Sequence, residues 1–196
     1  MNKDPNGHKE ESAALTRWQT LALSSPMIGQ AFFIGSMGVV QGIYAKYFGM
    51  ALTTLALVLL VGRIFDAVTD PLIGHFSDRS RVLRGSRKPF VLAGGLLLIP
   101  CSYFLFAPPP DVSIAYFATW TLLFYLASTL LTIPKNAWAS EINSNSVQRT
   151  ALFTTMGFSA RVGALLFYCV PILPLFTTNE ITPETLKFSV MVGAVM

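Results

Sequence analysis

The chain has 196 residues, of which 53% are hydrophobic and only 12% are charged, whereas a soluble domain carries about 25% charged residues. A soluble enzyme domain is therefore excluded, and the length divides into apolar segments of the roughly 20 residues that cross a bilayer. The net charge of +4 does not indicate nucleic-acid binding, because the basic residues cluster between long apolar segments, as in the loops of membrane proteins.

The first 18 residues are polar and too acidic for a cleaved signal sequence, so we expect a short cytoplasmic tail. The first predicted span covers residues 21–44 and is rich in small and polar residues, among them Gly35, Gly38 and Gln30. Small residues let neighbouring helices approach closely, and a buried amide is tolerated where it faces a bundle or a water-filled cavity. This composition predicts a helix inside a bundle.

Four further spans are predicted at residues 51–76, 90–107, 112–137 and 151–176. The third stops at Pro108-Pro109-Pro110, because proline lacks the amide donor that continues a helix. A sixth apolar segment, 186–196, has about half the length of a crossing. We therefore expect five complete spans and a partial sixth, the front part of a longer assembly completed by a missing C-terminal half or by a second chain.

The basic residues are concentrated on one side of the predicted spans. Five of them fall between the second and third spans, in a segment that is predicted to form a loop: Arg79, Arg81, Arg84, Arg87 and Lys88. Loops rich in lysine and arginine stay in the cytoplasm. The pattern therefore predicts an integral protein of the inner or plasma membrane with a cytoplasmic N-terminus.

Three charged residues, Arg63, Asp66 and Asp70, lie within the second span, with Thr69 next to them in sequence. Spacings of three and four residues put them on one helix face. A charge at the centre of a membrane helix costs about 2.5 to 3.5 kcal/mol, so these side chains must face partners or water. One interpretation is an Arg63–Asp66 ion pair that ties helices together, which leaves Asp70 unmatched. The other is an all-oxygen cation site for sodium or for a proton.

The segment GRIFDAVTDPLIGHFSDRSRVLRGSRKPF, residues 62–90, resembles the glycoside-pentoside-hexuronide:cation symporters, the melibiose-carrier branch of the major facilitator superfamily. The resemblance rests on the pattern R-x-x-D-A-x-x-D-P-x-x-G followed by an Asp-Arg pair and a basic stretch, and the order of apolar segments extends it over nearly the whole chain. It implies an all-α integral membrane protein, the N-terminal helical bundle of a major facilitator fold. It also implies a secondary active transporter, not an enzyme.

By this resemblance, Asp66 and Asp70 bind the coupling ion, which is Na+, Li+ or H+, and the only metal site expected is the one that they form for Na+. Thr69 and Thr129 are the implied hydroxyl ligands. Pro71 fits the same pattern because it frees backbone carbonyls in the preceding turn. The resemblance implies no organic cofactor.

The positions that correspond to the sugar site of the melibiose carrier are Gln30, Thr132, Asn136 and Arg161. The acidic residues and the aromatic residue of that carrier are absent here, and only the arginine is retained. The implied solute is a sugar or glycoside. A uronate that pairs with Arg161 and a non-sugar such as a lysolipid are the alternatives.

The end of the second span and the residues that follow it resemble the loop motif between helices 2 and 3 of major facilitators. It implies that Gly74, Asp78 and Arg79 act in gating, with Asp78 paired to a neighbouring helix end so that one face of the transporter stays closed. The resemblance gives Arg63 a structural role beside the two aspartates.

Two functions remain open at this point. The first is cation-coupled symport of a small solute by a protein embedded in membrane lipid. The second is a non-transporting membrane protein, a truncated relative that acts as a scaffold or regulatory subunit. A selective response to sodium that depends on Asp66 and Asp70 separates them, because a scaffold has no reason to respond to sodium.

Overall fold

The computed structural model describes residues 16–142, 146–174, 176 and 180–195. Across these ranges the chain forms helices and connecting turns, and no strand occurs in them. The elements are α1 (Arg17–Ser24), α2 (Pro26–Phe48), α3 (Leu52–Arg84), α4 (Lys88–Phe106), α5 (Ile114–Ile142), α6 (Ser146–Cys169), the 3-10 helix η1 (Val170–Ile172) and α7 (Pro183–Val195).

Five helical segments of the described chain are long and apolar enough to cross a membrane. They are Trp18–Phe48, Leu52–Leu83, Lys88–Phe106, Ile114–Ile142 and Ser146–Ile172. The prediction of an all-α membrane bundle with five spans is therefore confirmed. The partial sixth segment corresponds to α7, which begins at Pro183.

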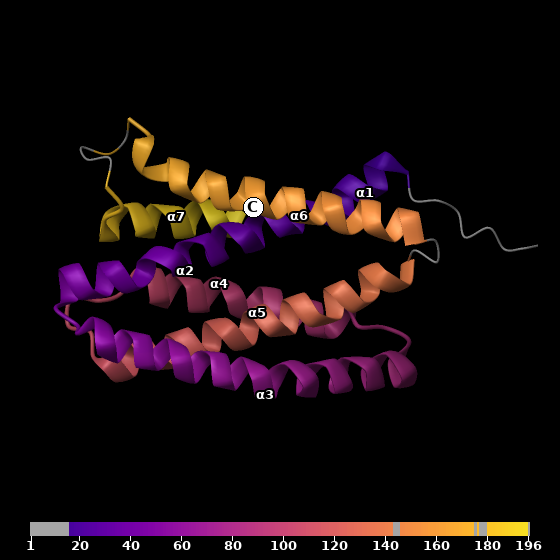
Figure 1. Cartoon of the computed structure of the whole chain (residues 1–196), viewed down its shortest axis with the longest axis horizontal. Coiled ribbons are helices and arrows are strands. Elements are labelled where there is room, and N and C mark those ends of the chain that lie inside the picture. The colour runs from indigo at the N-terminus through magenta and orange to yellow at the C-terminus, as the bar shows by residue number, and fades with distance from the viewer. Residues whose placement is uncertain (1–15, 143–145, 175, 177–179, 196) are drawn as a thin grey trace, which may run out of the picture.

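The helices form two groups that lie alongside each other (Figure 1). In one group α6 runs along α2, and in the other α3 and α4 both pack on α5, while α7 contacts α2 and α4. Aromatic rings join the helices in the core. Phe32 of α2 meets Phe167 of α6 edge-on at 5.6 Å between ring centroids, and Phe106 of α4 meets Phe124 of α5 at 5.8 Å.

The outer side of α3 is apolar and unburied. Leu60, Ile64 and Val68 are each more than half exposed although they are large hydrophobic residues. An exposed apolar stripe is unfavourable in water and suits contact with lipid or with another membrane-spanning segment. The side of α3 that carries the aspartates is turned toward α5.

The prediction of a loop over residues 79–88 is wrong for most of its length. The α3 helix continues through Arg79 and Arg81 to Arg84, and it ends only where Gly85 adopts a left-handed φ of 68°. Glycine adopts this conformation without the steric penalty of a side chain. Hydropathy marks where the lipid ends, whereas backbone hydrogen bonding continues for two more turns.

The predicted cytoplasmic tail lies outside the described residues up to residue 15. Thr16, the first described residue, caps α1. Its hydroxyl accepts a hydrogen bond from the backbone amide of Gln19, and the side-chain carbonyl of Gln19 accepts one from the backbone amide of Thr16. This reciprocal pair is a capping box, which fixes the start of a helix. Thus Arg17 and Trp18 belong to a helix and not to the tail.

Two glycines allow backbones of different helices to touch. A Cβ atom on Gly163 of α6 would lie 2.1 Å from the Ile28 carbonyl oxygen of α2, and one on Gly94 of α4 would lie 2.5 Å from the Leu131 amide nitrogen of α5. No real Cβ contact is this short, so each position requires glycine for the observed packing. These contacts set the spacing of α2 to α6 and of α4 to α5, and so the position of the helices around the site.

Candidate functional site

A cavity of about 500 Å³ lies between α2, α3 and α5. Its lining brings together residues that the sequence places in different spans. The polar ones are Gln41 of α2, then Arg63, Asp66 and Asp70 of α3, and Tyr125, Ser128, Thr129 and Thr132 of α5. Both predicted carboxylates and two predicted hydroxyl residues thus share one cavity.

Asp66 is the most constrained acidic group in this cavity. Its side chain is 19% exposed, its Oδ2 lies 3.8 Å from Nη1 of Arg63, and its Oδ1 is buried without a hydrogen-bond partner. The hydroxyl oxygen of Ser128, on α5, is also buried without a partner. Two unsatisfied oxygen atoms from facing helices are a costly arrangement unless a cation or a proton donor completes it.

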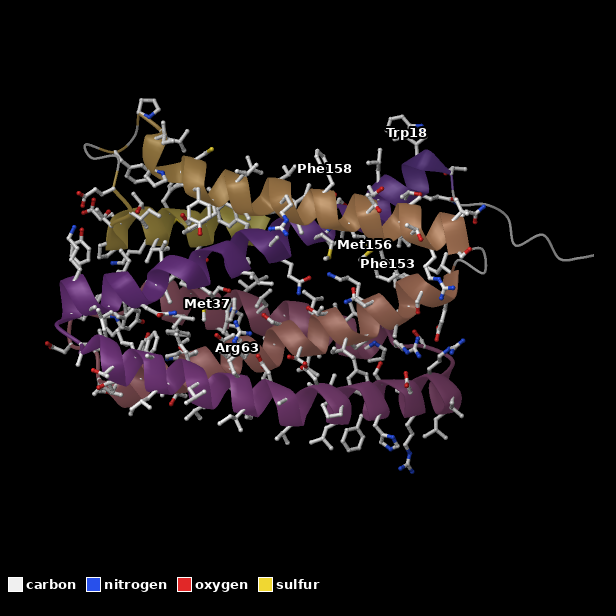
Figure 2. The ribbon with its side chains drawn as sticks, in the orientation of Figure 1. Trp18, Met37, Arg63, Phe153, Met156 and Phe158 are labelled. Carbon is white, nitrogen blue, oxygen red and sulfur yellow. The ribbon has the colours of Figure 1, made fainter. Side chains whose placement is uncertain are left out.

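Arg63 reaches into the cavity from α3, and Figure 2 shows it between α3 and α2, near Met37. Its guanidinium lies 5.4 Å from the centroid of the Tyr125 ring. This ring fits because residue 62 is glycine, where a Cβ atom would come within 2.6 Å of the ring. The long distance to Asp66 makes this a weak ion pair, so it does not neutralise the site.

The two predicted threonine ligands occupy different surroundings. Thr129 is 8% exposed and lines the cavity. The hydroxyl of Thr69 instead donates to the Phe65 carbonyl at 2.9 Å, one turn back on its own helix, and Thr69 is not among the residues that line the cavity. The structure therefore brings Thr129 to the aspartates and directs the hydroxyl proton of Thr69 to the backbone.

The four predicted solute residues divide in the same way. Thr132 lines the cavity, and its hydroxyl accepts a hydrogen bond from the buried amide of Gln30. Asn136 and Arg161 are not among the lining residues, and Arg161 is exposed on α6. The structure thus joins Gln30 with Thr132 and leaves the other two apart from this cavity.

Two residues near this cavity, Ser128 and Lys135, were not predicted from the sequence. Lys135 is only 7% exposed, and its ammonium group donates to Oε1 of Gln30 and to Sδ of Met27, the latter at 2.7 Å. The signal for Lys135 was a cation beside Pro134 within an apolar run. The signal for Ser128 was a hydroxyl directly before Thr129.

The predicted gating residues lie where α3 ends and α4 begins. The carboxylate of Asp78 accepts a hydrogen bond at 2.6 Å from Arg87, the residue before α4. The side chain of Arg87 is only 8% exposed. Glu141 of α5 lies 2.6 Å from Nη1 of Arg81 and 2.7 Å from Nη1 of Arg87. Gly74 lies near Ile133 of α5, and Arg79 is exposed. One carboxylate therefore links three helices at this end.

We expect Glu141→Gln to destabilise the folded protein by about 1 to 3 kcal/mol, the usual cost of leaving a buried polar group without its partner. The buried Arg87 then keeps only Asp78. Glu180→Gln is the control, because Glu180 also forms an ion pair, with Lys46 at 2.8 Å, but both of these side chains are more than 60% exposed. That hydrogen bond lowers the pKa of Glu180, yet solvent screens it.

The measurement is the melting temperature of the purified protein in detergent. A fall for Glu141→Gln with little change for Glu180→Gln is the expected pattern. Equal effects of the two substitutions would show that the ion pairs of Glu141 stabilise the protein no more than the exposed ion pair of Glu180 does.

The donor set of the cavity is oxygen-rich and contains two carboxylates. Within the described ranges no group of three or more His, Cys, Asp or Glu side chains is placed to hold a metal ion. The expectation of Asp66 and Asp70 as ligands for Na+ alone remains a prediction. Carboxylate and hydroxyl oxygens are the ligands that hard cations prefer.

Comparisons with known proteins agree with this architecture. Residues 26–196 match the family model for MFS/sugar transport proteins. The putative glycoside/cation symporter YagG of Escherichia coli is 32% identical over 125 residues, which are 62% of this chain and 27% of that protein. The inner membrane symporter YicJ of Escherichia coli is also 32% identical, over 63% of this chain and 27% of that protein.

An animal protein is similar as well. The sodium-dependent lysophosphatidylcholine symporter 1-A of Danio rerio is 29% identical over 151 residues, which are 72% of this chain and 27% of that protein. The chain thus spans less than a third of the length of these relatives. The five apolar helices and the family match together indicate an integral membrane protein. The relatives are named as symporters, so they are transporters and not enzymes. The chain belongs to the MFS/sugar transport protein family, a branch of the major facilitator superfamily.

Proposed function

We propose that this chain is the N-terminal helical bundle of a cation-coupled symporter, in which Asp66 and Asp70 bind Na+ or H+ with Thr129 and Ser128. The buried Oδ1 of Asp66, which has no hydrogen-bond partner, carries the proposal. A carboxylate oxygen in a membrane-spanning segment is stable only when a cation, a proton or a donor compensates it. Ser128 and Thr129 supply the further oxygen atoms from the facing helix.

The proposed solute is a sugar or glycoside that binds in the same cavity, next to Thr132 and Gln30. Hydroxyl and amide groups of this kind hydrogen-bond to sugar hydroxyls. YagG is named as a putative glycoside/cation symporter, whereas the Danio rerio relative is named for a lysophospholipid. Lysolipid is therefore the alternative substrate class. Asn136 and Arg161 stay predicted solute contacts, for a part of the path outside the cavity described above.

Coupling follows from the shared position of the two sites on α3 and α5. A bound cation neutralises the carboxylates and holds α3 against α5, and Thr132 of α5 is part of the solute site. A ligand shifts a conformational equilibrium only by its differential affinity for the two states. Here the ion-free bundle carries uncompensated charge, which opposes the rocking movement of alternating access.

We further propose that the end of the bundle with Arg79, Arg81, Arg87 and Lys88 faces the cytoplasm, together with the N-terminus. The positive-inside rule supports this orientation. The ion pairs of Glu141 and Asp78 then close the cytoplasmic face in one state of the cycle, and Gly74, Arg79 and Arg63 support that gate and the aspartates.

The test is uptake by the protein in its native membrane of labelled glycosides and of lysophosphatidylcholine, with Na+ and with choline in its place, and with and without a proton gradient. Ion-stimulated uptake of a glycoside is the expected result. Ion-stimulated uptake of lysophosphatidylcholine alone would establish the alternative substrate class. Failure to transport any solute, combined with stable association with another membrane protein, would refute transport and favour the scaffold.

A further inference from the structure

The buried ammonium group of Lys135 has no counter-charge. It lies on α5 within a membrane-spanning segment, it is 7% exposed, and its two hydrogen-bond partners among the described residues are the neutral side chains of Gln30 and Met27. Among the described residues, no carboxylate lies within 4.0 Å of it. Ionisable residues inside the membrane are rare and mark ligand paths, because their burial needs compensation.

The other elements around Lys135 offer no compensation. The α6 helix contributes Leu152 and Met156, which cluster with Ala139 of α5 and with Leu23 and Met27 on the N-terminal side, so this wall is apolar. The nearest acidic residue along α5, Glu141, is bound to Arg81 and Arg87. On α3, Asp66 is beside Arg63, and Asp70 lines the cavity without forming an ion pair with Lys135. The group that compensates the positive charge of Lys135 must therefore come from outside this set of residues.

A charge count identifies what that partner must be. The cavity is lined by two carboxylates, Asp66 and Asp70, and by one cation, Arg63, so without the coupling ion its lining carries one net negative charge. A coupling cation makes the lining neutral, and the positive charge of Lys135 then remains uncompensated. A solute with one negative charge restores neutrality, whereas an uncharged sugar does not. Net charge held in a low-dielectric environment is costly, so the loaded state favours the anion.

A polar path leads from the cavity to Lys135. Thr132 lines the cavity, its hydroxyl accepts from the Gln30 amide, and the Gln30 carbonyl oxygen accepts from Lys135. An oxyanion beside Thr132 therefore needs only a rotation of the Gln30 side chain to reach the ammonium group. A charged acceptor binds ammonium more strongly than the neutral amide it replaces.

We propose that Lys135 binds the oxyanion of the transported solute, so that the substrate is an organic anion with a carboxylate or phosphodiester group, and not an uncharged sugar. This inference rests on the proposed function and assigns a substrate class to its cavity. It makes Lys135 the residue that selects for charge, while Asp66 and Asp70 select the cation.

The experiment compares solutes that differ only in the anionic group, bound to the purified protein from its native membrane in the presence of Na+. One pair is an aryl glucuronide and the matching aryl glucoside, and the second is lysophosphatidylglycerol and the matching monoacylglycerol. Binding is measured as ligand-dependent thermal stabilisation, which does not require transport. Preference for the anionic member of either pair is the expected result, and the pair that shows it identifies the source of the oxyanion.

Two substitutions test Lys135 itself. Lys135→Met removes the charge, so it should weaken binding of the anion about 10- to 100-fold and leave binding of the uncharged member unchanged. Gln30→Glu supplies a fixed carboxylate at the contact. Because Gln30 also belongs to the proposed solute site, this variant should weaken binding of the anion more strongly than binding of the uncharged member. Lys187→Met, at an exposed lysine of α7, is the control that should change neither.

The outcomes separate this inference from the proposed function. Thermal stabilisation by Na+ alone reports the cation site and does not depend on Lys135. The inference is wrong if Na+ stabilises the protein but both members of each pair bind equally. It is also wrong if Lys135→Met weakens binding of the anionic and the uncharged member equally, since Lys135 then has only a packing role. If Na+ has no effect while Lys135 still discriminates the anion, the inference stands and sodium is refuted as the coupling ion.

Discussion

We expect Asp66→Asn to abolish the dependence of solute uptake on the coupling cation. Asparagine keeps the shape of the side chain and removes the charge, so the buried oxygen that has no partner in the cavity no longer attracts a cation. Coupling free energies of about 1 to 3 kcal/mol correspond to a stimulation of roughly 5- to 150-fold. In the variant, the ratio of uptake with Na+ to uptake with choline should fall to about one.

The control for this substitution is Asp111→Asn, in the exposed connection between α4 and α5. It removes the same charge from the chain without touching the cavity, so the stimulation by the cation should persist. Protein abundance in the membrane must be equal for both variants. Cation-stimulated uptake of normal size in Asp66→Asn would remove Asp66 from the ion site, whatever happens in the control.

Much of the proposed cation site follows from the sequence because helix periodicity fixes which residues share a face. The spacing of Asp66 and Asp70 alone predicts that both point in one direction, and the structure places both on one cavity. Thr129 joins them because α5 packs along α3, an arrangement that the family resemblance implies and composition does not. The partner of a helix face is a property of packing, which a single apolar segment does not encode.

The surroundings of individual polar groups were harder to predict. Thr69 is adjacent to Asp70 in sequence, yet its hydroxyl donates to the carbonyl of Phe65, since threonine in a helix competes for the carbonyl one turn back. Lys135 lies two residues before the end of the predicted span 112–137. Its burial depends on contact with Gln30 and Met27 of α2, and hydropathy does not predict which residues of another helix it contacts.

The glycines show the same limit. The first span is rich in small residues, which favours close packing, and Gly35 does approach Ala164 of α6. The closest backbone contacts, however, involve Gly94 and Gly163, while a Cβ on Gly42 of the first span would meet nothing within 4 Å. A small residue permits a close approach, but the opposing surface decides whether the approach occurs.

This difference between glycines predicts opposite effects for two identical substitutions on α6. Gly163→Ala places a methyl group 2.1 Å from the Ile28 carbonyl oxygen of α2, which is rigid helix backbone, so α2 and α6 must move apart. Overpacking of this kind costs about 1 to 3 kcal/mol. Alanine in a helix gains at most about 1 kcal/mol over glycine, so the net effect of Gly163→Ala should be a loss of stability.

Gly157→Ala is the matched control on the same helix, since a Cβ there meets nothing within 4 Å. It should leave the melting temperature unchanged or raise it, because only the gain in helix propensity remains. The two variants, measured side by side in detergent, should therefore shift the melting temperature in different directions. A Gly163→Ala protein as stable as the Gly157→Ala protein would mean that α2 and α6 separate at little cost, and the spacing of α2 to the cavity would then not depend on this contact.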